Sequence, residues 1–103
     1  MKRSEVFLSV VIRVRDAAPF IASALQRLIN VIEGNFDFYE IVLVDDASTD
    51  ATVAVISDLQ QNARNIQVYV LTQRRGDNVA VTVGLDHAIG DAVSYTHLRA
   101  HET

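Results

Sequence analysis

The sequence predicts an α/β fold in which a mostly parallel sheet is flanked by helices. Short runs rich in β-branched residues alternate along the 103-residue chain with longer segments whose apolar residues recur at helical spacing. Because strand and helix alternate three times, the strands are expected to lie parallel in one sheet. Carboxylates at a strand end then indicate a ligand site at one edge of that sheet.

Each element has a local signal. Pro19 suits the first position of the first helix because proline has no backbone N–H to lose there, and Asp16 is a candidate N-cap. Asp50 supplies capping chemistry for the second helix. The expected strands are 6–14, 40–45 and 66–72, and Gly90 and Asp91 are expected to open a fourth. The expected helices run from Pro19 to near Gly34, from Asp50 to about Ala63 and from Val79 to Ile89. A turn is expected at 74–78.

Composition limits the classes of function. The net charge of −4 and the isoelectric point near 5.1 argue against nucleic-acid binding. The chain has no cysteine, which excludes disulfides and thiolate metal sites. The apolar run Val6 to Val14 spans only about nine residues and Arg13 interrupts it, so it is neither a signal peptide nor a membrane span. A cytoplasmic location without a membrane segment is expected.

The most informative stretch is IVLVDDASTDAT, residues 41–52. Four aliphatic residues predict a buried strand, and Asp45 and Asp46 follow it directly. Packing explains this acidic pair poorly, because charges are rarely buried without partners and ligands of open α/β sheets bind just beyond the strand ends. On these residues alone, a helix N-cap beside a solvated acid is an equally good account.

Three motifs together resemble those of family 2 glycosyltransferases, which have the GT-A nucleotide-sugar-binding fold. Residues 44–50 resemble the family's Val-Asp-Asp-Gly-Ser-Thr-Asp signature, with Ala47 in place of the usual Gly. Residues 8–16 resemble its first strand and the Pro-x-Tyr-Asn motif, and residues 84–91 resemble the segment before its fourth strand. The resemblance covers residues 6–92 and implies a Rossmann-like, truncated GT-A half that binds the nucleotide-sugar donor of a glycosyltransferase.

The resemblance also implies roles at the end of the second strand. In the family the second acid of the signature, here Asp46, binds the nucleotide through its base or ribose, and a carboxylate suits this task because it accepts hydrogen bonds from imide or hydroxyl donors. Asp45 either binds nucleotide or orients the loop and caps the next helix. Val14 and Val44 are expected to line the nucleotide pocket, with plain core positions as the alternative.

The first strand departs from the family pattern at three positions. Asp16 matches the family's Asn and keeps a polar side chain, although a simple N-cap explains it equally well. Arg15 occupies the usual Tyr position, where a guanidinium can also stack on the base. Arg13 stands where Pro is usual, and it either reaches a diphosphate or forms an ion pair with Asp16 or Asp46.

Residues 93–103 resemble a translated sequencing adapter, so residues 1–92 are expected to be the N-terminal part of the glycosyltransferase domain and the tail to be non-native. The tail is expected to continue a strand only briefly and to lack a core role.

In the family an Asp-x-Asp motif follows the Gly-Asp and holds Mg or Mn against the diphosphate, and a later acid acts as base. Neither is present here, so no catalytic residue or metal ligand is expected and the chain should be inactive by itself.

Some features point to the acceptor and to rival functions. Residues 79–88 look closer to members that use polyprenyl phosphates, including dolichol-phosphate mannosyltransferase-like enzymes, which implies a lipid-linked phosphate acceptor. Arg74 and Arg75 lie where the family often approaches the donor diphosphate, although a solvated basic turn is the commoner fate of such a pair.

One alternative to a glycosyltransferase is a nucleotidyltransferase, yet residues 13–19 contain neither the Gly nor the Lys that its loop needs. The other is a catalytically inert nucleotide-binding fragment.

Overall fold

The computed structural model describes residues 4–63, 65–73 and 77–99. All described strands belong to one parallel sheet with the order β3-β2-β1-β4. This confirms the predicted α/β class and the shared sheet of the first three strands. The elements are β1 (Ser4–Arg15), α1 (Ile21–Glu33), β2 (Phe36–Asp46), α2 (Thr52–Gln61), β3 (Ile66–Leu71), α3 (Asp77–His87) and β4 (Ala92–Arg99).

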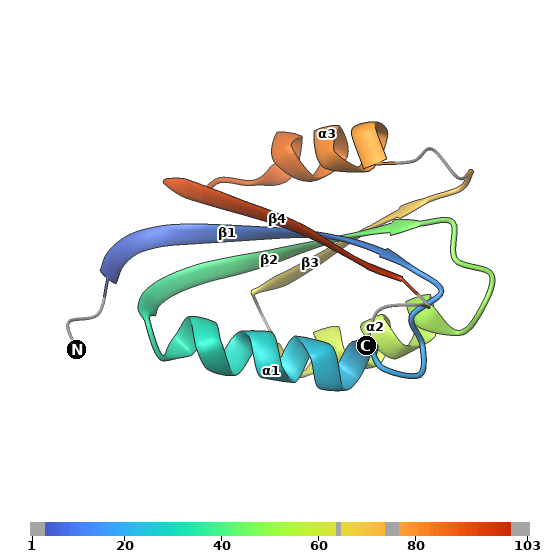
Figure 1. Ribbon diagram of the computed structural model, residues 1–103, viewed down its shortest axis with the longest axis horizontal. Helices are drawn as coiled ribbons and strands as arrows, with labels where there is room; N and C mark the ends of the chain where they lie inside the picture. The colour runs from blue at the N-terminus through green and yellow to red at the C-terminus, as the bar shows by residue number, and fades with distance from the viewer. Residues whose placement is uncertain (1–3, 64, 74–76, 100–103) are drawn as a thin grey trace.

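The molecule has three layers, with α1 and α2 on one face of the sheet and α3 on the other (Figure 1). The strand pleat sends alternate side chains to opposite faces. Ile12 and Leu43 therefore join the core beneath α1 and α2, whereas Val11 and Val42 join a smaller cluster beneath α3. Because β1 and β2 are covered on both sides, their sequences read as continuous aliphatic runs.

The two valines predicted to line a nucleotide pocket lie in the core. Val14 belongs to the cluster beneath α1 and α2, and Val44 belongs to the cluster beneath α3. Both are 0% exposed, on opposite faces of the sheet. A contact with nucleotide stays a prediction for both residues, while their packing role is directly visible.

The predicted helix starts are wrong by about two residues. Pro19 lies in the turn before α1, whose N-cap position is taken by Phe20 with no side-chain cap hydrogen bond, so Asp16 does not cap this helix. Helix α2 begins at Thr52, after Asp50. Asp16 is used in contacts between loops, which are described below, and Asp50 takes part in those contacts while it also accepts the backbone N–H of Thr52.

The predicted turn at 74–78 is also too long, because α3 already begins at Asp77. Residues 74–76, including Arg74 and Arg75, lie outside the described residues.

Strand β4 pairs with β1 from Leu8↔Ala92 to Arg15↔Arg99, so the expectation of only a brief strand is wrong. Half-buried Tyr95 packs against the cluster beneath α3 and gives the tail a core contact. The origin of residues 93–103 stays a prediction.

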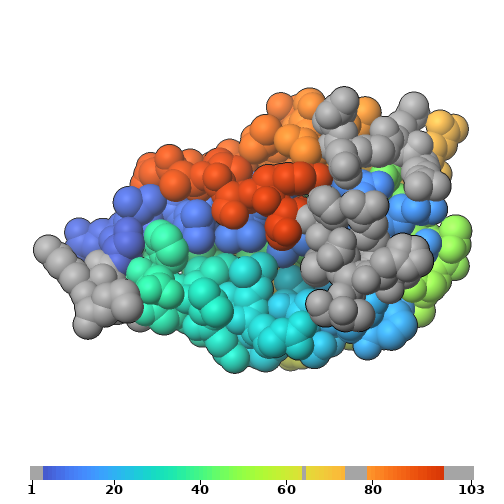
Figure 2. Space-filling model, in the orientation of Figure 1, coloured from blue at the N-terminus to red at the C-terminus, as the bar shows by residue number. Residues whose placement is uncertain are grey.

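Strand β4 and helix α3 lie next to each other along one side of the surface, with α1 along the opposite side (Figure 2). Within the described ranges, each helix is too short or too polar to span a lipid bilayer.

Candidate functional site

The candidate site lies at the carboxyl ends of β1 and β2, which are neighbours in the sheet. Val14 of β1 is in register with Asp45 of β2. Because the pleat alternates, Asp45 points to the face covered by α1 and α2, as Leu43 does, and Asp46 points to the face covered by α3, as Val44 does. The two adjacent acids therefore belong to two different environments.

Asp46 forms a buried ion pair with Arg13 of β1. The Arg13 Nε and Nη2 atoms both donate to Asp46 Oδ2, at 3.1 and 2.7 Å. The side chains are 7% and 0% exposed. Of the three partners considered for Arg13 from the sequence, the structure shows Asp46. In a site closed to water such a pair costs much desolvation, and each charge depends on the other to stay buried.

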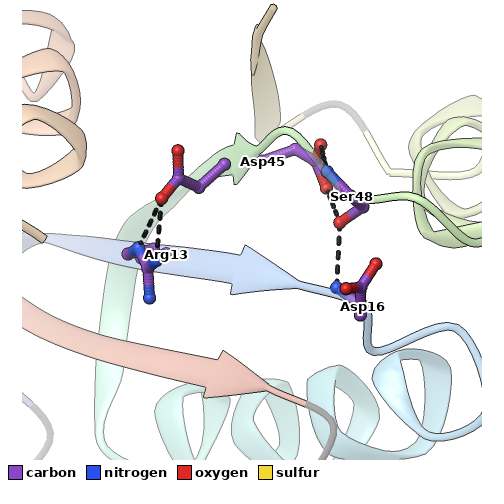
Figure 3. A network of polar contacts seen from close by, with 5 residues as sticks. Arg13, Asp16, Asp45 and Ser48 are labelled. Atoms are coloured by element: carbon purple, nitrogen blue, oxygen red, sulfur yellow. Dashed lines mark hydrogen bonds and ion pairs between the residues drawn. The ribbon is translucent and has the colours of Figure 1, made fainter. Parts of the chain in front are cut away.

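Asp45 instead organises the loop that follows β2. Its carboxylate accepts the Ser48 backbone N–H at 3.1 Å and the Ser48 hydroxyl at 2.6 Å. The same Ser48 Oγ accepts the backbone N–H of Asp16 at 2.9 Å (Figure 3). Asp45 thus orients the loop, which is one of the two roles that the sequence left open for it, and Ser48 links that loop to the end of β1.

The loops after β1 and β2 also bind each other through their acids. Asp16 Oδ1 accepts the backbone N–H groups of Thr49 at 2.7 Å and Asp50 at 3.3 Å. In return, Asp50 Oδ2 accepts the backbone N–H of Ala18 at 3.2 Å, and Ala17 donates to the Thr52 hydroxyl at 2.9 Å. Asp16 therefore joins the two loops and does not cap α1, whereas Asp50 joins the loops and also accepts the backbone N–H of Thr52, the first residue of α2, at 2.9 Å.

Hydrogen bonding sets the charge state of Asp50. Burial works to raise the pKa of the Asp50 carboxyl, but hydrogen bonds donated by Thr52 and by the backbone of Ala18 outweigh this effect and hold that pKa below its ordinary value. Asp50 is therefore a carboxylate at neutral pH. Sequence reasoning named Asp50 but missed Ser48 and Thr52 as loop-fixing residues, although two hydroxyls spaced among acids are typical of such side-chain-to-backbone contacts.

Ala47 has a backbone conformation that suits glycine. Its φ is +57°, in the left-handed region where a Cβ atom is sterically unfavourable. The turn is forced on it, because Asp46 ends β2 while Ser48 folds back to Asp45. The family signature that residues 44–50 resemble has Gly at this position, which would adopt the same backbone conformation without a Cβ atom.

Replacing Ala47 by glycine is expected to raise the free energy of unfolding by about 1 kcal/mol, since relief of left-handed strain outweighs the added freedom of the unfolded chain. Urea unfolding of the two proteins measures the change. Ala54→Gly provides the matched control, because Ala54 lies on the exposed side within α2 and should lose stability on the same substitution. Destabilisation by Ala47→Gly would mean that the turn is not strained.

The described residues do not form a cation site. Asp45 and Asp46 point to opposite faces and are bound to Ser48 and Arg13 respectively. No cluster of three or more His, Cys, Asp or Glu side chains suited to a metal ion occurs among the described residues. The acids at this edge therefore fit loop fixation and ion pairing, and no step that needs Mg or Mn can be built on them.

A separate groove of about 160 Å³ lies between α1 and α2. Its lining includes Leu25, Ile29, Leu59 and Ile66. Ile66 is the first residue of β3, so the groove is near the amino ends of the strands and away from the acidic loops. Its apolar lining and its position separate it from the candidate site.

Fold and site together define an open α/β domain whose ligand site is expected at the carboxyl ends of two central strands. The family model for glycosyl transferase family 2 matches residues 9–97. The chain belongs to glycosyl transferase family 2. The family and GT-A fold expected from the motifs are thereby confirmed.

Individual relatives agree with this membership. The undecaprenyl-phosphate 4-deoxy-4-formamido-L-arabinose transferase of Edwardsiella ictaluri is 35% identical over 84% of this chain and 27% of its own length. The dolichol-phosphate mannosyltransferase of Mycosarcoma maydis is 41% identical over 50% of this chain and 17% of its own length. The solved mannosyltransferase of Pyrobaculum calidifontis, in complex with GDP-Man and Mn2+, matches with a TM-score of 0.74 and 26% identity over 87% of this chain and 26% of its own. The chain thus spans about a quarter of these longer proteins or less.

Proposed function

We propose that this chain is the donor-binding part of a glycosyltransferase that moves a sugar from a nucleotide donor to an acceptor. The observation that carries the proposal is the pair of interlocked loops after β1 and β2, which contain the family's signature acids at the edge where open α/β sheets bind ligands. The donor-binding step is assigned to this chain, and the transfer step to the longer parent.

The seven residues predicted from the sequence keep distinct parts in this proposal. Asp46 accepts hydrogen bonds from the base or ribose, which requires the Arg13 pair to open or α3 to shift, because Asp46 is 0% exposed. The remaining residues act around it: Asp45 and Asp16 hold the loops, Arg13 and Arg15 supply positive charge, and Val14 and Val44 pack beneath the strand ends, one on each face of the sheet.

Three properties of the parent are proposed from the relatives. The name of the Edwardsiella ictaluri relative and that of the Mycosarcoma maydis relative each contain a polyprenyl-type phosphate, which supports a lipid-linked phosphate acceptor. The Pyrobaculum calidifontis structure contains GDP-Man and Mn2+, which supports a nucleotide-sugar donor and an Mg or Mn ion held by residues outside this chain. A cytoplasmic location at the membrane surface would bring such an acceptor to the site.

Replacing Asp46 by asparagine is expected to weaken binding of GDP or UDP by about ten-fold or more, because a hydrogen bond to a charged acceptor contributes about 1.5–3 kcal/mol. Isothermal titration calorimetry of the folded chain with each nucleotide measures the change. Asparagine keeps the shape of the side chain but removes its charge.

The matched control is Asp58→Asn, which removes one negative charge from the exposed surface of α2 and should leave nucleotide affinity unchanged. Thermal unfolding of each variant verifies that the protein titrated is folded. Equal affinity of the chain and its Asp46→Asn variant would reassign Asp46 to the ion pair alone. Failure of the unchanged chain to bind either nucleotide would contradict the proposed function.

A further inference from the structure

Arg15, the last residue of β1, has a donor that the fold leaves unused. Its Nε atom is buried and has no hydrogen-bond partner among the described residues. Buried polar atoms in native proteins are nearly always hydrogen-bonded, and a guanidinium N–H loses free energy when it is removed from water without an acceptor. A donor that no described residue satisfies, at the carboxyl end of a central strand where open α/β sheets bind ligands, is a candidate contact for an acceptor on a ligand.

The charges on this face of the sheet indicate the sign of that acceptor. Arg13 and Arg15 are two residues apart in β1 and so point to the same face, which is the face covered by α3. Asp46 is on that face and is bound to Arg13. Asp45 points to the opposite face, and Asp16 accepts hydrogen bonds from the loop after β2. Among the residues just named, the charge of Arg15 is the one without a carboxylate partner, and β4 brings a second arginine, Arg99, into register with it.

Access distinguishes the two arginines. Arg13 is 6% exposed and is held in its pair, whereas the Arg15 side chain is only half-buried at the end of the strand. Because the Arg15 residue is partly exposed although its Nε atom is buried, a ligand from solvent can approach the side chain without breaking the Arg13–Asp46 pair. Desolvation on the buried side strengthens an interaction with an anion at the open side.

We propose that Arg15 forms an anion subsite for phosphate groups, so that it holds the diphosphate of the nucleotide donor and does not stack on the base. The guanidinium is planar, always charged and presents paired N–H donors that match phosphate oxygens. This assignment rests on the proposed function for the identity of the donor, but the subsite itself requires only the Arg15 geometry. No bond is made or broken in this step.

The test measures binding of inorganic pyrophosphate to the full 103-residue chain by isothermal titration calorimetry. Arg15→Gln is expected to weaken that binding by about ten-fold or more, because a hydrogen-bonded charge is removed. Arg27→Gln removes the same charge from the exposed surface of α1 and is expected to leave the affinity unchanged. Unaltered pyrophosphate affinity in Arg15→Gln, or an equal loss in Arg27→Gln, would overturn the subsite.

Arg15→Lys serves as the second variant, because it keeps the charge and the fold while losing the planar fork. It is expected to weaken pyrophosphate binding several-fold, which a purely electrostatic or structural role would not do. If Arg15→Gln fails to fold, Arg15→Lys decides by the same criterion. Absence of any pyrophosphate binding to the unchanged chain also overturns the subsite.

Nucleosides separate the subsite from the proposed function. If the chain binds pyrophosphate through Arg15 but shows no preference for GDP or UDP over pyrophosphate, the subsite is supported and the nucleotide proposal fails. If guanosine or uridine binds as tightly as its diphosphate and Arg15→Gln weakens both equally, Arg15 contacts the nucleoside and the phosphate assignment is overturned.

Discussion

Replacing Arg13 by alanine is expected to lower the free energy of unfolding by about 3–5 kcal/mol, because it removes the guanidinium that donates two hydrogen bonds to the buried Asp46 carboxylate. The pair is closed to water, with side-chain exposures of 7% and 0%. A loss of this size is a large part of the stability of a domain of this length. Urea unfolding followed by circular dichroism measures it.

Arg27→Ala on the exposed surface of α1 is the control and should change stability by less than about 0.5 kcal/mol. The double variant Arg13→Met and Asp46→Leu should recover most of the loss, since apolar residues replace both charges at once. A small effect of Arg13→Ala would show that water or another cation reaches Asp46 easily.

Replacing Gly90 by alanine is expected to destabilise the chain by about 1–3 kcal/mol, because the added methyl group overpacks a contact between backbones. Its Cβ would lie 2.5 Å from Ser9 Oγ, 2.7 Å from Phe7 O and 2.8 Å from Ser9 N. Two of these atoms are backbone atoms of β1 and cannot turn aside. The Gly90 N–H also donates to Ser9 Oγ at 2.8 Å, so the clash disrupts the link between β1 and β4.

Gly34→Ala is the matched control, because a Cβ at Gly34 would have its nearest neighbours at 3.5 Å and the backbone φ is −73°. This substitution should be neutral or slightly stabilising, since it reduces the freedom of the unfolded chain. Hydrogen exchange should show the loss in Gly90→Ala first at the amide of Asp91, which donates to Phe7 O at 2.8 Å. Equal stability of Gly90→Ala and the unchanged chain would contradict the close packing.

The strands were predictable from the sequence because local and tertiary preferences agree there. The aliphatic runs of β1 and β2 are buried on both faces, and β3 matches its predicted span. The α/β class followed from the alternation of those runs with helices. Elements whose stability comes from a continuous apolar pattern are the ones that such a pattern identifies.

The helix starts were less predictable because the capping residues are used elsewhere. Asp16 and Asp50 have the chemistry of N-caps, and each also binds the opposite loop, a contact between positions more than thirty residues apart. Local propensity has no information about such a partner. Only Asp50 keeps a contact with the start of its helix, through the backbone N–H of Thr52. The opposite directions of the Asp45 and Asp46 side chains could be predicted, because successive residues of a strand point to opposite faces. The pairing of Arg13 with Asp46 could not, because it depends on the register of β1 against β2.

The extent of β4 was the least predictable element. Residues 92–99 contain polar and aromatic residues without a long apolar run, and their strand conformation comes from pairing with β1. An edge strand of this kind is specified by the neighbour that it meets, more than by its own side chains.

The order of strands in the sheet also determines when the chain can finish folding. Strand β1 precedes the other described strands along the chain, yet it lies between β2 and β4 in the sheet. One contact that closes its second edge joins residues 84 positions apart. Closing so long a segment costs chain entropy before any pairing is gained, which slows folding. During synthesis, one edge of β1 therefore stays unpaired until β4, the last of the described strands, has been made.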